Sequence, residues 1–103
     1  MAKIKLTASP TFKSPVMIPV PGGRPASVEF TFKGRTKDEF RDFVDGIEGR
    51  DDVSLILDIA SGWDLDDPFG KETVEQLLQN YMGSARAILD KYMGELMGAR
   101  LGN

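Results

Sequence analysis

Along the first third of the chain, apolar and polar residues alternate with a period of two, which places successive side chains on opposite faces of a β-strand. Ile4 and Leu6 alternate with lysine and threonine, and this predicts a short strand near the start. A second strand is predicted over residues 12–20, but Pro15 and Pro19 each lack the N–H that a strand ladder needs. We therefore expect this strand to lie at a sheet edge or to be interrupted. Its apolar face is formed by Val16, Ile18 and Val20.

A turn and a third alternating segment follow. Residues 21–25 read Pro-Gly-Gly-Arg-Pro, which is the clearest turn in the sequence. Val28, Phe30 and Phe32 then alternate with charged and polar residues, as is typical of a strand with one buried face. We predict a small antiparallel β-meander with a hairpin tip at residues 21–25. The glycines there do not indicate a phosphate-binding loop, because no Lys-Ser or Lys-Thr follows at the required spacing.

The hydrophobic period changes after Gly34 to that of a helix. Thr36 and Glu39 have the spacing of a capping box, which indicates a helix start. The apolar positions that follow recur at i, i+3, i+4 and i+7, and they predict an amphipathic helix with one buried stripe. These positions are Phe40, Phe43, Val44 and Ile47. Gly46 and Gly49 favour the end of this helix.

Residues 53–60 are apolar on nearly all sides and admit two interpretations. Asp51 and Asp52 precede them, and acidic residues are favourable at the positive end of a helix dipole. A helix with so little polar surface belongs in a core. A buried strand is the competing interpretation, since Ile and Val favour strands and the run is short. We favour the helix because aspartates precede the run and Ser61 and Gly62 follow it.

The last third of the sequence predicts two further helices. A linker over residues 62–70 contains Trp63 and leads into a segment of helical spacing that ends at Tyr81. A longer amphipathic helix follows. Gly83 separates the two, which predicts a helical hairpin or a bent helix.

The order of these elements predicts an α+β fold, with a small N-terminal antiparallel meander or hairpin and about four helices packed on it. The 103 residues are enough for one hydrophobic core. We expect a single domain over residues 1–103, β-rich over 1–35 and helical over 36–103.

Composition and charge exclude several classes of function. The formal net charge is −3 and the basic residues are scattered, so nucleic-acid binding has no electrostatic footprint. The sequence has no histidine and no cysteine, and so lacks the commonest general base, the commonest metal ligand and any thiolate. No apolar run approaches the roughly 18 residues of a membrane span, and the first residues lack the apolar region of a signal peptide. We therefore expect no enzyme activity, no cofactor and no membrane partner.

Three aspartates in the linker are the tightest acidic cluster. Asp64, Asp66 and Asp67 provide the oxygen ligands that a divalent cation prefers. An EF-hand loop is excluded, because it needs glycine at the sixth position, which is Phe69 here. The interpretation we favour is a solvated loop that leads into the next helix, with no metal bound.

The final helix carries residues suited to contact with another chain. Met93 and Met97 lie four residues apart and therefore on one helix face, with Gly94 and Gly98 on the adjacent face. Methionine adapts to irregular apolar partners, and glycine permits close backbone approach. Core filling is the alternative for the methionines, and a core anchor between the sheet and the last helices is the alternative for the single tryptophan. As a hypothesis, a partner helix lies in a groove between the last two helices and contacts Trp63, Met93, Met97 and Leu101.

The order of motifs in residues 53–103 resembles that of a known family. A Gly-Trp-x-Leu turn at residues 62–65 is followed by Pro68 and Phe69, and then by a helix that ends in Tyr81. The chain closes with Tyr-x-x-x-Leu-x-x-Ala-Arg-x-x-Asn from Tyr92 onward. This succession resembles the phage tail assembly chaperones of long-tailed bacteriophages.

The resemblance implies a function in virion assembly. Such chaperones act in the cytoplasm of the infected bacterium, where they coat the long, apolar, helical tape measure protein and keep it soluble until tube subunits polymerise around it. The implied partner is the tape measure protein, with the tail tube protein and a second copy of the chain as further possible partners. The alternative is a minor structural or adaptor subunit of a phage tail or head-tail junction, with the hairpin at residues 21–25 as an assembly arm.

Overall fold

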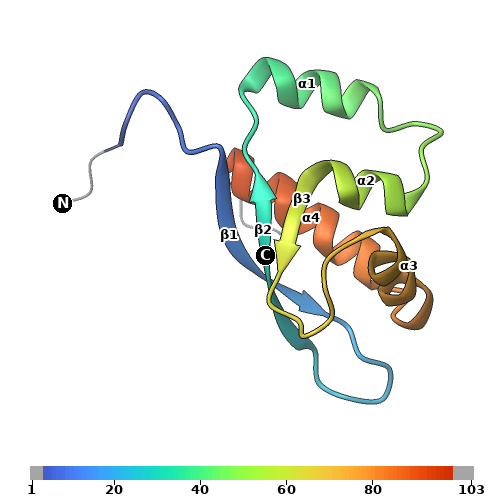
Figure 1. Ribbon diagram of the computed structural model, residues 1–103. Helices are drawn as coiled ribbons and strands as arrows, with labels where there is room; N and C mark the ends of the chain where they lie inside the picture. Colours follow the sequence, from blue (N-terminus) through green and yellow to red (C-terminus); the bar gives the residue numbers. More distant parts are fainter. Residues whose placement is uncertain (1–3, 99–103) are drawn as a thin grey trace.

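The computed structural model describes residues 4–98, in which a three-stranded sheet is combined with four helices. Strands β1 (Thr11–Ile18) and β2 (Ala26–Lys33) form an antiparallel hairpin, and β3 (Ala60–Trp63) pairs antiparallel with the other side of β2. The sheet order is therefore β1-β2-β3 (Figure 1). The helices are α1 (Lys37–Asp45), α2 (Asp52–Ile59), α3 (Lys71–Asn80) and α4 (Ser84–Met97). The predicted α+β class and the N-terminal hairpin are confirmed.

The hairpin has the predicted alternation. Val16 pairs with Val28 and Ile18 with Ala26, so the apolar residues of both strands share one face. That face is buried at Val16, Ile18, Val28, Phe30 and Phe32. β1 lies at a sheet edge, as its prolines predicted, although it ends before Pro19 and Val20 lies outside it.

Helix α4 covers the apolar face of the hairpin (Figure 1). Ile88 and Tyr92 point into the core and are fully buried. The α4 helix ends at Gly98, whose φ of +70° is in the left-handed region that glycine adopts without strain. Gly98 therefore ends the helix. The sequence pattern had placed Gly98 inside the helix, and that prediction is wrong.

The strand predicted around Ile4 and Leu6 is wrong. This segment is a loop, and the side chains are 90% and 101% exposed. The alternating pattern is present, but no neighbouring strand pairs with the segment among the described residues, and a strand without a partner is not stable.

The segment after Asp51 contains both a helix and a strand. The helix is confirmed for α2, which buries Leu55, Ile56 and Ile59. At Ala60 the chain becomes extended and forms β3, a strand that the sequence pattern did not predict. Trp63 pairs with Phe30 of β2, so the residue expected in a linker belongs to the sheet.

Helix α1 is only partly as predicted. The capping box is present: Thr36 Oγ1 accepts from Glu39 N–H at 3.1 Å, and Glu39 Oε1 accepts from Thr36 N–H at 2.8 Å. The predicted buried stripe is wrong, because Phe43 alone in this helix is buried and Val44 is 41% exposed.

Candidate functional site

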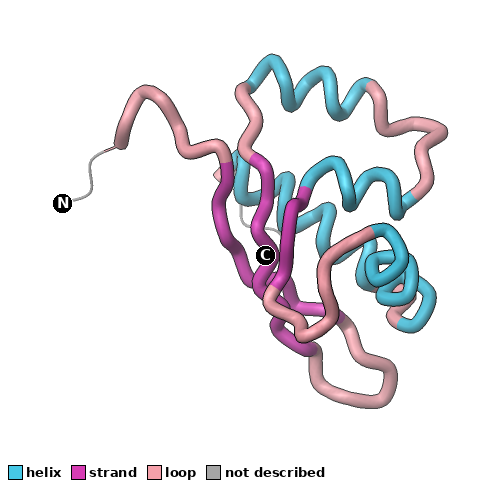
Figure 2. Tube along the Cα trace, in the orientation of Figure 1, coloured by secondary structure: helices cyan, strands magenta, loops and turns pink. Residues whose placement is uncertain are grey.

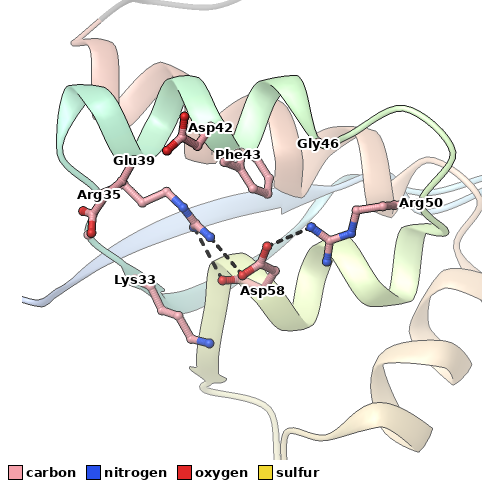
Figure 3. A pocket seen from close by; sticks show the side chains of 9 residues that line it. Lys33, Arg35, Glu39, Asp42, Phe43, Gly46, Arg50 and Asp58 are labelled. Carbon is pink, nitrogen blue, oxygen red and sulfur yellow. Dashed lines mark hydrogen bonds and ion pairs between the residues drawn. The ribbon is translucent and has the colours of Figure 1, made fainter.

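A polar network joins the β2–α1 connection to α2 and α4. Arg35 Nη2 forms an ion pair with Asp58 Oδ1 at 2.9 Å, and Arg50 Nη1 binds Asp58 Oδ2 at 2.9 Å (Figure 3). Arg35 Nη1 also donates to the Tyr92 hydroxyl at 2.8 Å, and its guanidinium carbon lies 4.5 Å from the centre of the Phe43 ring. One carboxylate thus receives two guanidinium groups from separate segments.

Burial and pairing shift the pKa values in this network. Desolvation alone raises the pKa of Asp58, but hydrogen bonds and charge from Arg50 and Arg35 outweigh it and hold the pKa below its ordinary value. Burial raises the pKa of the Tyr92 phenol, which therefore stays protonated and donates to the Lys33 carbonyl oxygen at 2.8 Å. Each shift is explained by partners inside the fold.

The hollow beside this network has a volume of about 470 Å³, and both signs of charge line it. Its positive groups are Lys33, Arg35 and Arg50, and its negative groups are Glu39, Asp42 and Asp58. Because the guanidinium groups bind Asp58 and the hollow has no net charge, we assign these residues to holding α1 and α2 together. Neither Arg35 nor Asp58 is marked by the sequence pattern, because their ion pair joins positions 23 residues apart.

A second hollow, of about 340 Å³, is largely apolar. Its floor is the end of the hairpin at Ile18 and Val28, and its walls are Trp63, Leu65 and the α3 residues Leu77 and Tyr81. Figure 2 shows the loop between β3 and α3 turning back beside this end of the sheet. We call this feature the Trp63 hollow.

The Trp63 ring has a fixed orientation. It makes edge-to-face contacts with Phe30 and Phe69, with ring centres 5.9 and 5.0 Å apart. Its Nε1–H donates to the backbone oxygen of Asp67 at 2.7 Å. The indole is therefore a rigid wall, partly buried against the sheet as a core anchor and partly open to the hollow.

Of the four residues expected to line one partner groove, the three within residues 4–98 do not line a common hollow. Trp63 lines its hollow with residues of α3, and neither methionine lines it. Met93 is half-buried against the core, whereas Met97 is 67% exposed at the end of α4. Leu101 lies outside the described residues. The sequence pattern did not predict Leu65, Leu77 and Tyr81 as neighbours of Trp63. Apolar spacing shows which residues share a face, but it does not show which of them remain accessible to a partner.

Of the three aspartates in the linker, Asp64 has a structural role. Asp64 Oδ1 accepts from the N–H of Glu29 at 2.9 Å, and Asp64 N–H donates to the Glu29 oxygen at 3.0 Å, which extends the contact between β2 and the linker. The Asp66 and Asp67 side chains are exposed. Within residues 4–98, no three acidic side chains are grouped so that they can hold a metal ion.

These observations define a class of protein: a small α+β protein with an apolar hollow beside Trp63 and exposed methionines at the two ends of α4. None of the helices found in residues 4–98 has the length and apolar character to cross a membrane. A protein-family model described as phage tail assembly chaperone matches residues 1–103. The chain belongs to the family of phage tail assembly chaperones, as the motif order in its second half indicated. The comparisons with curated proteins and with solved structures found no match.

Proposed function

We propose that the chain binds the tape measure protein of a long-tailed phage and keeps it soluble in the bacterial cytoplasm until tube subunits assemble around it. Membership of the tail assembly chaperone family carries this proposal, since it assigns the chain to tail assembly. A tape measure protein is apolar, helical and prone to aggregate, and it therefore needs a chaperone before the tube assembles.

Accessible apolar surface supports the proposal. Met82 and Met97 are 88% and 67% exposed, and Leu65, beside the Trp63 hollow, is 39% exposed. A chaperone that holds an apolar helix needs such surface, and methionine adapts to partners of varied shape. The net charge of −3 supports solubility while this surface is open.

We propose further that the activity involves no covalent chemistry. The sequence lacks histidine and cysteine, and the strongest polar network found in residues 4–98 uses its charged groups to join α1, α2 and α4. Binding and release of another protein require neither a nucleophile nor a cofactor.

Co-expression tests the proposed function directly. The tape measure protein of the same phage, expressed alone, should be insoluble, and co-expression with this chain should move it to the soluble fraction as a complex that survives size-exclusion chromatography. A matched control is co-expression with an unrelated acidic protein of similar size. If the tape measure protein stays insoluble, or is soluble without the chain, the proposed function is wrong.

Of the two methionines on α4, only Met97 is suited to a test by substitution. Replacing Met93 with aspartate would place a charge against the core, so a loss of binding would reflect unfolding. Met97 is exposed and can be changed to serine without such damage. A substitution at Met97 therefore tests whether the end of α4 contacts the partner.

The second candidate function is a minor structural or adaptor subunit of the tail or head-tail junction. The turn between β1 and β2 favours it, because residues 21–25 are exposed and project from the sheet (Figure 1). Mass spectrometry of purified virions separates the two functions. A structural subunit remains in the finished particle at a fixed copy number, whereas an assembly chaperone is lost or present only in traces.

A further inference from the structure

The Trp63 hollow has the size and lining of a site for a large apolar side chain. Its volume of about 340 Å³ exceeds that of one leucine or phenylalanine side chain, and its lining includes Ile18 and Val28, which are buried residues of the hairpin end. The rigid Trp63 ring and the α3 residue Leu77 also line it. Apolar anchors that enter pockets of this kind dominate the binding energy of many interfaces.

The charge around this hollow has one sign. Asp67 lines it, and Asp66 lies next to Asp67 in the same loop. The other polar residues of its lining are uncharged, namely Thr73, Gln76 and Asn80, and no lysine or arginine belongs to the lining. Neither Asp66 nor Asp67 forms a side-chain ion pair within residues 4–98. The complementary ligand therefore combines an apolar side chain with a positive charge.

The position of the hollow favours a helix as the incoming segment. An extended peptide would add to a sheet edge through backbone hydrogen bonds. The Trp63 hollow is instead lined by side chains of one sheet face, Ile18 and Val28, and by side chains of α3, so an incoming segment meets side chains there. A helix satisfies its own backbone groups and can present one side chain to such a hollow.

We propose that the Trp63 hollow receives a large apolar side chain from an amphipathic helix of the partner, and that a lysine or arginine within one turn of this anchor pairs with Asp66 and Asp67. The inference rests on the proposed function, in which that helix belongs to the tape measure protein. The proposed site is a different surface from the end of α4, where Met97 lies.

Two synthetic helices test the chemistry of this site. One is an 18-residue amphipathic peptide of leucine and lysine, and the other is the same peptide with glutamate in place of lysine; the length of about 18 residues gives five helical turns. Trp63 is the only tryptophan of the chain, and so its fluorescence reports on this hollow alone. We expect the leucine–lysine peptide to shift the Trp63 emission to shorter wavelength, and the leucine–glutamate peptide to leave it unchanged.

Variants separate the apolar part of the site from its charge. Ala26 lines the hollow and shares a strand face with Val28, so Ala26→Phe fills the space with a residue that strands favour. We expect this variant to weaken binding of the leucine–lysine peptide about tenfold or more, measured by calorimetry. The double variant Asp66→Asn/Asp67→Asn should weaken binding by about threefold to tenfold, and the loss should shrink at high salt.

The controls match each change. Asp45→Asn/Glu48→Gln removes the same charge from exposed positions at and after the end of α1, and Met17→Thr removes an exposed apolar side chain from β1 that does not line the hollow. Both should bind the peptide as the unmodified chain does, and circular dichroism should confirm that all variants fold. Equal affinity for the two peptides, an unchanged Trp63 emission, or equal losses in the control and test variants would overturn the proposed site.

The same variants distinguish this inference from the proposed function. With the full tape measure protein, Ala26→Phe and Asp66→Asn/Asp67→Asn should lose the soluble complex, while Met17→Thr keeps it. If the unmodified chain forms the complex and the hollow variants do so equally well, the chaperone function stands and the site is elsewhere. If the unmodified chain forms no complex, the proposed function itself fails.

Discussion

Tyr92 joins parts of the chain that are far apart in sequence. Its hydroxyl donates to the oxygen of Lys33 and accepts from Arg35 Nη1, both at 2.8 Å, while its fully buried ring packs against Phe32 and Phe43. Helix α4 is thereby attached to the end of β2 through one side chain. The spacing of apolar residues predicted the amphipathic helix that carries Tyr92, but it gave no partner for the hydroxyl.

Replacing Tyr92 with phenylalanine should cost about 1–3 kcal/mol of unfolding free energy, because the ring remains while the Lys33 oxygen and the Arg35 guanidinium lose a buried partner. Urea denaturation measures the loss. The matched control is Tyr81→Phe, since Tyr81 is only half-buried and its hydroxyl has no hydrogen bond within the described residues. Equal stability of the two variants would show that the hydroxyl of Tyr92 contributes nothing.

Asp58 gives the fold a specific dependence on pH. Although desolvation opposes its charge, Arg50 and Arg35 hold its pKa in the folded state below the ordinary value of 3.8. A carboxyl whose pKa is lower when folded stabilises the fold above the unfolded pKa, and this contribution is lost as the pH falls through the folded pKa. The loss should occur as the pH falls from about 5 towards 2.

The Asp58→Asn variant should therefore be less stable than the unmodified chain at neutral pH, and the difference should narrow on acidification. Thermal unfolding between neutral pH and the lowest pH at which the chain stays folded provides the measurement. Parallel stability curves for the two proteins would contradict this account of Asp58.

At the scale of elements, α1 is attached less firmly than the other helices. Phe43 is its only buried residue, and α1 is in none of the close element pairs, whereas α3, which also buries one residue, packs against α2 and α4. The capping box at Thr36 and the Arg35 contact with Phe43 therefore carry much of its stability. Amphipathic spacing predicted the helix correctly and overstated its burial, because periodicity shows which residues share a face and not how closely another element covers it.

The Thr36→Ala variant should open α1 without unfolding the remaining structure. Loss of the cap costs a helix about 1 kcal/mol, so amide hydrogens of α1 should exchange about fivefold faster, while those of α4 keep their rates. Hydrogen exchange followed by NMR measures both helices at once. Thr36→Ser retains the accepting oxygen and should restore the original rates; uniform acceleration in both helices would instead indicate global destabilisation.

The boundary between α2 and β3 shows how context decides an element. The apolar run after Asp51 suits both a helix and a strand, and the structure uses it for both, with the change at Ala60. The end of the run becomes a strand because β2 offers a free edge on which Trp63 pairs with Phe30. That edge is formed by residues about thirty positions earlier, so local pattern alone does not reveal it.

At the scale of the whole molecule, packing separates the apolar residues into core and contact surface. Helix α4 closes one face of the hairpin with Ile88 and Tyr92, yet leaves Met97 outside. The loop from β3 to α3 keeps the Trp63 hollow open at the far end of the same sheet. Two accessible apolar regions therefore lie in different parts of the molecule, where the sequence had suggested one groove.

The sequence by itself determined the hairpin, the capped start of α1, the helices and the family, since these depend on short-range periodicity, turn residues and motif order. Tertiary structure alone decided the third strand, the pairing of Asp58 with two arginines, and which apolar side chains remain open beside Trp63. Those features join residues from distant segments, and a one-dimensional pattern records which residues are apolar or charged without recording which of them meet.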